Sequence, residues 1–447
     1  MAANSSTEVN EQLTAVDAAI DRLAGQASDL LAELVAVPSV NPRQPGVVAD
    51  EMVGGELAAN KILASRLSDL GMSINWVAIQ EGRPNLVATI GGAGHGRSLA
   101  INAHIDTVSA GEVSAWRDPG PWQLTEADGF LYGLGASDTK SGHAIAWLAV
   151  AALQDAGITL AGELQVHSVV GEETMSHEIG TSAVIEAGYR TDAAIVIEPT
   201  STPENPLMVA NAAAGNYLFD VTVRGKSTHW ASRGRAIHAG GEGDAVGVNA
   251  IDKAFIVYRA LRDLEERWGI TKQHAQFLDG TFIIHPGVLH ADVGVPAAPY
   301  FPDRARFAYL LSFPPGETAE DIRDEVTEHV VRATSSDPWL RANPVEFDWL
   351  DSWPPAHTPA EHPLTQAVLA ARNDIVLASA AGTVQSHPVA NSAQSDASFY
   401  ELAGIPAVVF GPGDRTTAHG SDDRVEAALL ASAARVLARA VVSWCNA

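Results

Sequence analysis

Six carboxylate and imidazole side chains stand where the sequence predicts that strands end or turns begin. Nitrogen and oxygen ligands of these types suit Zn, Mn or Co, and a site with few protein ligands for each ion leaves room for water. Open α/β sheets form their ligand sites at the carboxyl ends of the strands, so residues at these places can meet in the fold. The sequence therefore predicts a divalent-metal centre. Its residues are His104, Asp138, Glu172, Glu173, Glu198 and His419.

A seventh residue, Asp106, follows His104 at a distance of two positions. Residues two apart in an extended segment point the same way, so the Asp106 carboxylate is expected to accept the free ring N–H of His104 and fix its tautomer. A lone His-x-Asp is structural far more often than functional. The prediction depends on the coincidence of several such groups at strand ends.

The elements that must position these residues alternate in the first half of the chain. Apolar runs of strand length are separated by helical stretches, a pattern that indicates parallel pairing with helices on both faces of the sheet. We therefore expect an α/β catalytic domain with a mostly parallel sheet. The predicted strands are Leu99–His104, Leu164–Val170 and Ala193–Ile197, and the predicted helices are Ala144–Leu153 and Thr181–Ala187.

The pattern changes after Pro199, where a stretch rich in Pro, Ser and Thr predicts a linker. Alternation of apolar and polar residues around Phe219 then indicates a half-exposed antiparallel strand, and further helices and strands complete an α+β unit. The α/β pattern resumes near Pro363. We expect a catalytic domain in two parts, 1–208 and 351–447, with the second domain, 209–350, inserted between them.

Composition narrows the class of protein. A net charge of −26, from 54 acidic and 28 basic residues, repels phosphate groups, so neither nucleic acid nor an anionic membrane is an expected partner. Cys445 is the single cysteine, which excludes an intramolecular disulfide and a Cys-rich zinc site. Neither a signal peptide nor an apolar run long enough to span a bilayer is predicted. We expect a cytoplasmic protein that acts on a small molecule.

The order of five short motifs is more specific than any single residue. They are His104-Ile105-Asp106, the Gly-x-x-Asp-x-Lys-x-Gly of Gly135 to Gly142, Glu172-Glu173, Glu198-Pro199-Thr200, and Gly411-Pro412-Gly413 with the later His419. In this order they resemble the metallopeptidase family that includes acetylornithine deacetylase, succinyl-diaminopimelate desuccinylase, the aminoacylases and the carboxypeptidase G type. The likeness runs from about Leu30 to the C-terminus.

The resemblance implies how the metal ligands are shared. Asp138 would bridge two metal positions, one completed by His104 and Glu198 and the other by Glu173 and His419. One or two divalent ions of Mn, Zn or Co would then be bound by each subunit.

The resemblance also implies the catalytic groups. Glu172 would take a proton from the attacking water and give it to the leaving nitrogen. The inserted domain would be a lid and a dimerisation domain, giving a homodimer or a higher homo-oligomer. Its His229 would reach the partner subunit's site and stabilise the developing oxyanion.

The residues expected to bind the substrate carboxylate depart from the family pattern. Family members usually hold a substrate carboxylate with an Asn before a Pro-Asp in the lid and with an Arg in a following Asp-x-Arg. Pro299 and Ser312 stand at those places here. Other arginines of the inserted domain could bind a substrate acid instead, from different directions. They are Arg233, Arg235, Arg304 and Arg306.

Three functions remain open on the sequence alone. The first is a metal-dependent hydrolase that cleaves a C–N bond of a small carboxylate-bearing substrate, as an amidohydrolase, deacylase or dipeptidase. The second is an aminohydrolase of the 5-nitroanthranilic acid type, which replaces an aromatic amino group by hydroxyl and releases ammonia. The third is a non-catalytic binding protein, which the presence of Glu172 beside the metal ligands disfavours.

Overall fold

The computed structural model describes residues 2–379, 385–391 and 394–447. Contacts within the chain divide it into two compact units. The first contains the residues up to Ala212 and most of those from Ala356 onward, and the second contains Ala213–Pro355. Each unit has a hydrophobic core of its own.

A nine-stranded sheet forms the centre of the first unit. Its middle strands are buried along their whole length, as expected for a sheet with helices on both faces. The order is β1 (Ser73–Val77), β2 (Asn85–Ile90), β6 (Leu164–Val169), β3 (Leu99–His104), β7 (Ala193–Val196), β15 (Ala407–Phe410), β8 (Val209–Ala213) and β13 (Ala356–His357), with β14 (Val389–Asn391) paired to β8.

Four neighbouring strands of this sheet, β6, β3, β7 and β15, are parallel. His104 pairs with Val169, so β3 and β6 end side by side. The antiparallel strands β1, β2 and β8 lie outside this group. The mostly parallel α/β sheet predicted from the sequence is confirmed, and the carboxyl ends of its four central strands share one edge.

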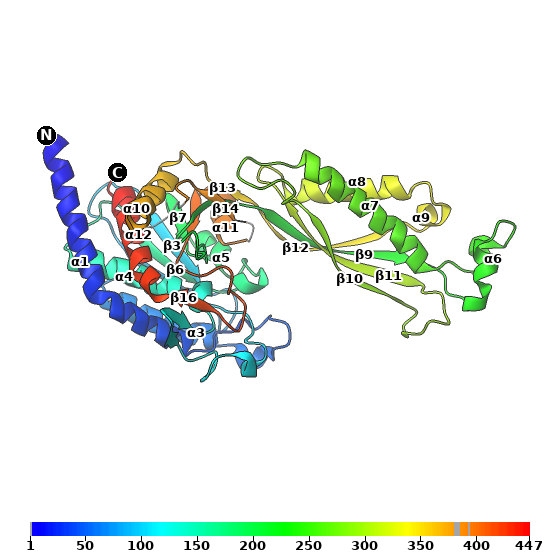
Figure 1. Cartoon of the computed structure of the whole chain (residues 1–447), viewed down its shortest axis with the longest axis horizontal. Coiled ribbons are helices and arrows are strands. Elements are labelled where there is room, and N and C mark those ends of the chain that lie inside the picture. The colour runs from blue at the N-terminus through cyan, green and yellow to red at the C-terminus, as the bar shows by residue number, and fades with distance from the viewer. Residues whose placement is uncertain (1, 380–384, 392–393) are drawn as a thin grey trace. The chain divides into compact units, whose positions relative to one another are not determined.

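Helices cover both faces of the sheet (Figure 1). On one face, α1, α4, α10 and α12 pack against one another, and α5 and α11 lie together on the other. The Ala-rich helix α4 is buried on almost every side, which suits a core helix. The bounds are α1 (Ala2–Val35), α2 (Ala49–Met52), α3 (Gly55–Asp69), α4 (Ser141–Asp155), α5 (Thr181–Glu186), α10 (Pro363–Ser379), α11 (Ala397–Leu402) and α12 (Ala427–Cys445).

Helix α12 is long and largely apolar, but Arg435 and Arg439 interrupt its apolar run. Among the described residues it is the one helix long and apolar enough to span a bilayer by length and composition. It packs as a core helix against α1, α4 and α10, and 61% of its apolar window is buried. Its Arg435 and Arg439 form ion pairs with Asp17 and Asp21 of α1.

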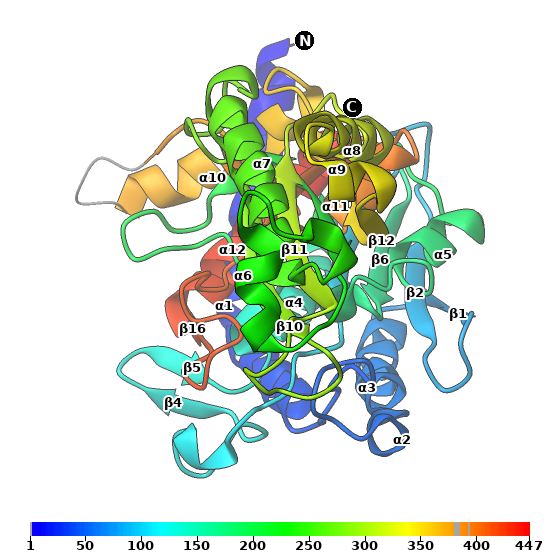
Figure 2. The ribbon, with the colours of Figure 1, turned by 90° about the vertical axis from the view of Figure 1, so that its right-hand side faces the viewer.

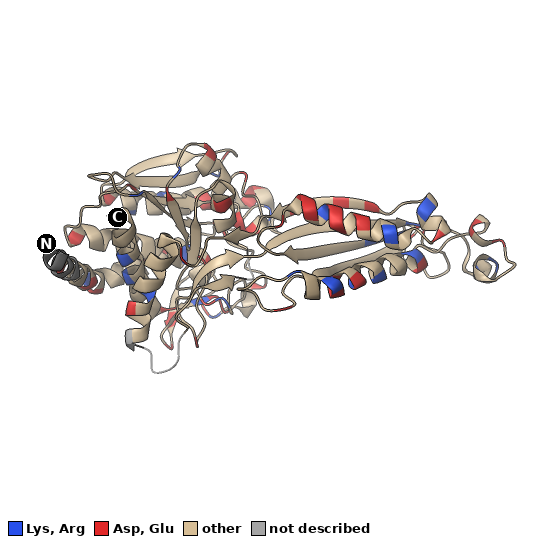
Figure 3. Cartoon of the chain, turned by 90° about the horizontal axis from the view of Figure 1, so that it is seen from above, with Lys and Arg blue, Asp and Glu red and all other residues tan. Residues whose placement is uncertain are grey.

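The second unit is a four-stranded antiparallel sheet with two long helices. Helices α7 and α8 contact each other and the same sheet (Figure 1, Figure 2). Acidic and basic residues both occur along each of these helices (Figure 3). The strand order is β10 (Ile284–Asp292), β11 (Arg304–Phe313), β9 (Gly215–Arg224) and β12 (Glu346–Trp353), and the helices are α6 (Arg233–Ile237), α7 (Ala250–Thr271), α8 (Ala319–Thr334) and α9 (Pro338–Ala342).

Local sequence signals set the starts of the helices in the second unit. Asn249 accepts a hydrogen bond from the backbone N–H of Ile251, and Thr318 forms a capping box with Asp321 before α8. These capping groups directly precede the first residues of α7 and α8. Strand β8, by contrast, pairs in the first unit, so the chain crosses into the second unit after Ala212.

Candidate metal centre

All six residues predicted for the metal centre belong to the first unit, at the edge where its parallel strands end. This placement follows from the strand order, because the carboxyl ends of parallel neighbours lie together. His104 ends β3, Glu172 and Glu173 follow β6, Glu198 follows β7, His419 lies in the segment after β15, and Asp138 lies in the turn Ala136–Lys140 that leads into α4.

Asp138 stands between the two histidines. Its Oδ1 is 3.0 Å from Nε2 of His104, and its Oδ2 is 3.2 Å from Nε2 of His419. His419 Nε2 is also 3.0 Å from Oε2 of Glu173. Ligand atoms of His104, Asp138 and Glu173 all lie within 4.8 Å of one another. A carboxylate with one oxygen toward each imidazole has the arrangement expected of a bridging ligand.

Two further glutamates complete the cluster around His104. Oε2 of Glu172 and Oε2 of Glu198 are each 3.9 Å from Nε2 of His104. Both side chains are largely buried, with exposed fractions of 13% and 9%. The structure therefore brings every predicted ligand and the predicted base into one group.

The charges of the cluster shift the pKa values of its histidines. Burial would lower the pKa of His104, but the hydrogen bond to Asp138 and the nearby glutamates raise it well above its usual value. The hydrogen bonds to Asp138 and Glu173 raise the pKa of His419 to about 11. Burial would raise the pKa of Asp138, and the two histidines lower it below its usual range. The shifts of all three groups arise from the close approach of the two imidazoles to the carboxylates around them.

The pKa values of the three glutamates are raised, in contrast to that of Asp138. Burial raises the pKa of Glu172 and of Glu198 well above the usual value, the charge of His104 opposes this, and the neighbouring carboxylates add to it. Burial together with Asp138 also raises the pKa of Glu173. Carboxylates so close together in a buried place need positive charge to remain ionised.

A divalent cation fits this set of donors. Within the described part of the chain, Glu173 Oε1 is buried and has no hydrogen-bond partner. An unpaired buried carboxylate oxygen is costly, and a metal ion would satisfy it. Histidine nitrogen with carboxylate oxygen is the donor set typical of Zn, Mn or Co.

The predicted role of Asp106 needs a correction. The ring Nδ1 of His104 lies 2.9 Å from the backbone carbonyl oxygen of Asp106, while the nearer carboxylate oxygen is 3.8 Å away. The carboxylate instead accepts hydrogen bonds from the backbone N–H groups of Gly171 and Glu173 and from the Asn41 side chain. Asp106 therefore holds the turn that carries Glu172 and Glu173, because two nearby N–H groups of that turn face its oxygens.

Sequence reasoning missed a buried acid beside the cluster. Asp396 is 2% exposed, its Oδ2 has no hydrogen-bond partner among the described residues, and its charge acts on Glu172 and Glu198. Burial raises the pKa of Asp396 to about 7. An Asp just before a helix is usually interpreted as an N-cap, so the sequence does not mark Asp396 as a neighbour of the cluster. Here the Asp396 side chain forms no capping hydrogen bond to α11.

His229 and the four predicted substrate arginines belong to the second unit. His229 lies at a backbone bridge to Tyr300, and its Nδ1 accepts from the N–H of Ala231. Three of the arginines already pair with acids of their own unit, and Arg304 begins β11. The pairs are Arg233 with Asp252, Arg235 with Glu242, and Arg306 with Asp220.

The hydroxyl of Ser312 is likewise engaged. It donates to the carbonyl of Thr281 and accepts from the N–H of Ile283, so it ties two segments of the second unit together. The backbone carbonyl of Pro299 accepts from the N–H of Trp230, next to His229. Neither residue supplies the amide or guanidinium that the family pattern leads one to expect.

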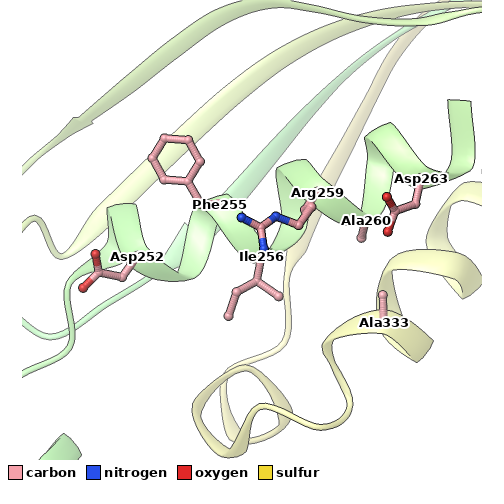
Figure 4. A pocket seen from close by; sticks show the side chains of 7 residues that line it. All are labelled: Asp252, Phe255, Ile256, Arg259, Ala260, Asp263 and Ala333. Atoms are coloured by element: carbon pink, nitrogen blue, oxygen red, sulfur yellow. The ribbon is translucent and has the colours of Figure 1, made fainter. Parts of the chain in front are cut away.

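A surface hollow in the second unit has no features of a metal site. Its volume is about 390 Å³, and side chains from α7 and from Ala333 of α8 line it (Figure 4). Phe255 and Arg259 extend into this region from α7, and Asp252 at its border already pairs with Arg233. The hollow contains no histidine, in contrast to the cluster of the first unit.

The part of the chain that matches a known protein family includes every residue of the cluster. The sequence profile described as peptidase family M20/M25/M40 matches residues 100–443. An N-formyl-4-amino-5-aminomethyl-2-methylpyrimidine deformylase of Bacillus subtilis is 31% identical over 86% of this chain and 88% of its own length. A succinyl-diaminopimelate desuccinylase of Methylorubrum populi is 30% identical over 91% of this chain and 96% of its own.

A solved structure supports the same fold. A tripeptidase from Staphylococcus aureus superposes with a TM-score of 0.69 at 19% identity, over 95% of this chain and 99% of that one. The family, the α/β fold and the hydrolase class predicted from the sequence are confirmed. The chain belongs to peptidase family M20/M25/M40, whose members are metal-dependent hydrolases of C–N bonds.

Proposed function

We propose that this chain hydrolyses the amide bond of a small N-acylated amine at the cluster around Asp138. The observation that carries the proposal is the position of Asp138, with one carboxylate oxygen on each of two histidines. The proposed metal ligands are His104, Asp138, Glu173, Glu198 and His419, which would hold one or two ions of Zn, Mn or Co.

The bound ion would supply Lewis-acid polarisation of the carbonyl and would lower the pKa of water. The chain's own residues perform the proton transfers. Glu172 is the candidate base because it is the one glutamate of the cluster that the family pattern does not assign to a metal, and its carboxylate lies 3.9 Å from His104. One Glu172 oxygen takes a proton from the attacking water as the C–O bond forms. The same proton then passes to the amide nitrogen as the C–N bond breaks.

A substrate without a carboxylate on its amine side agrees with the second unit. Ser312 stands where family members usually have an arginine, and its hydroxyl is bonded to backbone. Arg233 and Arg306 are paired with acids. The deformylase of Bacillus subtilis is named for an N-formyl aminomethylpyrimidine, and no carboxylate appears in that name. We therefore propose an N-acyl amine with a flat ring as the substrate class.

The substrate class predicts a ranking of turnover. The value of kcat/KM for N-formyl-4-amino-5-aminomethyl-2-methylpyrimidine should exceed that for N-acetylornithine and N-succinyl-diaminopimelate. A missing charge-assisted contact to a carboxylate is worth about 1.5–3 kcal/mol, roughly 10- to 100-fold. Released formate and free amine are measured with one Mn-loaded preparation and one Zn-loaded preparation.

The same assay tests the alternatives. If ammonia is released from 5-nitroanthranilate and no formate is released from the formyl amine, the function is aromatic deamination. Efficient cleavage of N-acetylornithine would show that the enzyme is a deacylase of N-acyl amino acids. Metal binding without turnover of any amide or aromatic amine would favour the binding protein.

We further propose that the second unit joins two copies of the chain. Strand β10 lies at an edge of its sheet, and Val288 and Leu289 on it are half exposed. An edge strand with apolar side chains is a template for pairing with a second chain. In such a homodimer, His229 of one subunit would serve the site of the partner.

Complementation tests the shared site. His229→Ala and Glu172→Gln should each be inactive alone, whereas a refolded mixture should recover about a quarter of the parent activity. Half of randomly mixed dimers contain both variants, and each of those has one complete site of two. Activity is measured after size-exclusion chromatography. Mixed dimers that form without any recovery would contradict the proposal, and a mixture of Glu172→Gln with Glu173→Gln serves as the negative control.

A further inference from the structure

A buried aspartate links the turn that carries Asp138 to the segment that carries His419. Asp423 is four residues beyond His419 and is 1% exposed. Its Oδ2 accepts from the N–H of Gly135 at 2.6 Å, and its Oδ1 accepts from the N–H of Ser137 at 2.7 Å. Gly135 directly precedes the Ala136–Lys140 turn that carries Asp138, and Ser137 lies within it. One carboxylate therefore contacts the Asp138 turn from the segment that carries His419.

Further contacts align the same two segments. The N–H of Gly133 donates to the backbone carbonyl of Asp423 at 3.0 Å, and Ser137 Oγ donates to that of Asp414 at 3.0 Å. Just beyond them, β16 (Arg424–Glu426) pairs with β5 (Phe130–Tyr132), which also pairs with β4 (Thr125–Ala127). The Asp423 carboxylate lies among these backbone contacts. It therefore helps to fix the distance between Asp138 and His419.

The chemistry of the link calls for a carboxylate. Two N–H groups point at one side chain, and an ionised carboxylate is the acceptor-only group that satisfies both. Gly135 has a φ of +84°, and a Cβ there would lie 3.0 Å from Thr107 and Lys140 side-chain atoms, so this turn has little freedom to shift. Asp106 holds the Glu172–Glu173 turn through the same kind of paired bonds.

We propose that Asp423 is a positioning residue for the metal centre, with Ser137 as a second link. It sets the distance between Asp138 and His419 so that both can bind the same ion. The inference rests on the metal centre proposed above. Outer partners of this kind typically change metal affinity by about 10- to 100-fold.

The test is metal affinity of the full chain, measured for Zn²⁺ and Mn²⁺ by competition with a chelator. Asp423→Asn retains the shape but has a single acceptor oxygen, so its NH₂ faces one of the two N–H groups. We expect an affinity roughly 10- to 100-fold weaker than that of the parent. Asp422→Asn is the matched control, because Asp422 is 52% exposed and pairs with Arg424 at the surface. It should bind metal as the parent does.

A thermal unfolding curve of the metal-free protein separates positioning from general stability. Weaker affinity in Asp423→Asn with a folded metal-free protein supports the proposal, and saturating metal should then restore kcat. Parent-like affinity in this variant overturns it. If Asp423→Asn does not fold, Ser137→Ala decides instead: a few-fold loss of affinity supports the link, and unchanged affinity overturns it. A parent protein that binds neither ion would refute the metal centre itself.

Discussion

Replacement of Asp138 by alanine is expected to abolish metal binding and, with it, hydrolysis. Asp138 places one oxygen at 3.0 Å from His104 and the other at 3.2 Å from His419. Alanine removes both contacts at once, so any ion bound between these residues loses its bridging ligand. Because loss of an outer partner costs about 10- to 100-fold in affinity, loss of a bridging ligand should cost more.

This prediction is tested by measuring the metal content of Asp138→Ala after dialysis, by mass spectrometry. His104→Ala should lose metal in the same way, whereas Asp422→Ala, an exposed acid of the His419 segment, should retain the parent content. Chelation of the parent should abolish activity, and added Mn or Zn should restore it. Full metal content in Asp138→Ala would contradict the bridging role.

Glu172→Gln is expected to bind metal normally and to lose turnover. Glutamine has the size of glutamate but cannot accept the proton from water, and general acid–base steps contribute about a hundred- to ten-thousand-fold. Glu172 also lies at 3.9 Å from His104, farther than Asp138 does. The substitution therefore removes the proton acceptor and leaves the histidine contacts of the cluster intact.

The adjacent residue provides the matched comparison. Glu173 contacts His419 at 3.0 Å, so Glu173→Gln should weaken metal binding, while Glu172→Gln should not. Both variants are compared for metal affinity, for substrate binding and for single-turnover rate. If Glu172→Gln turns over substrate within a few-fold of the parent rate, Glu172 is not the general base.

The architecture of the first unit and the membership of the cluster follow from the order of elements along the chain. Apolar strands alternate with helices, and parallel strands bring their carboxyl ends to one edge. His104 ends such a strand, and Glu173 and Glu198 each follow one, so their meeting follows from chain order and pairing. The capping signal of Thr318 set the start of α8 in the same local way.

The partners that individual polar groups find depend on how distant parts of the chain fold together. Asp106 bonds to the Glu172–Glu173 turn and not to the ring of His104, Asp396 lies buried beside the cluster, and Arg233 pairs with Asp252. Asp423 reaches the turn of Asp138 across nearly three hundred positions of the chain. Such contacts depend on how distant segments pack, and hydrogen bonds act over about 3 Å, so no local pattern encodes them.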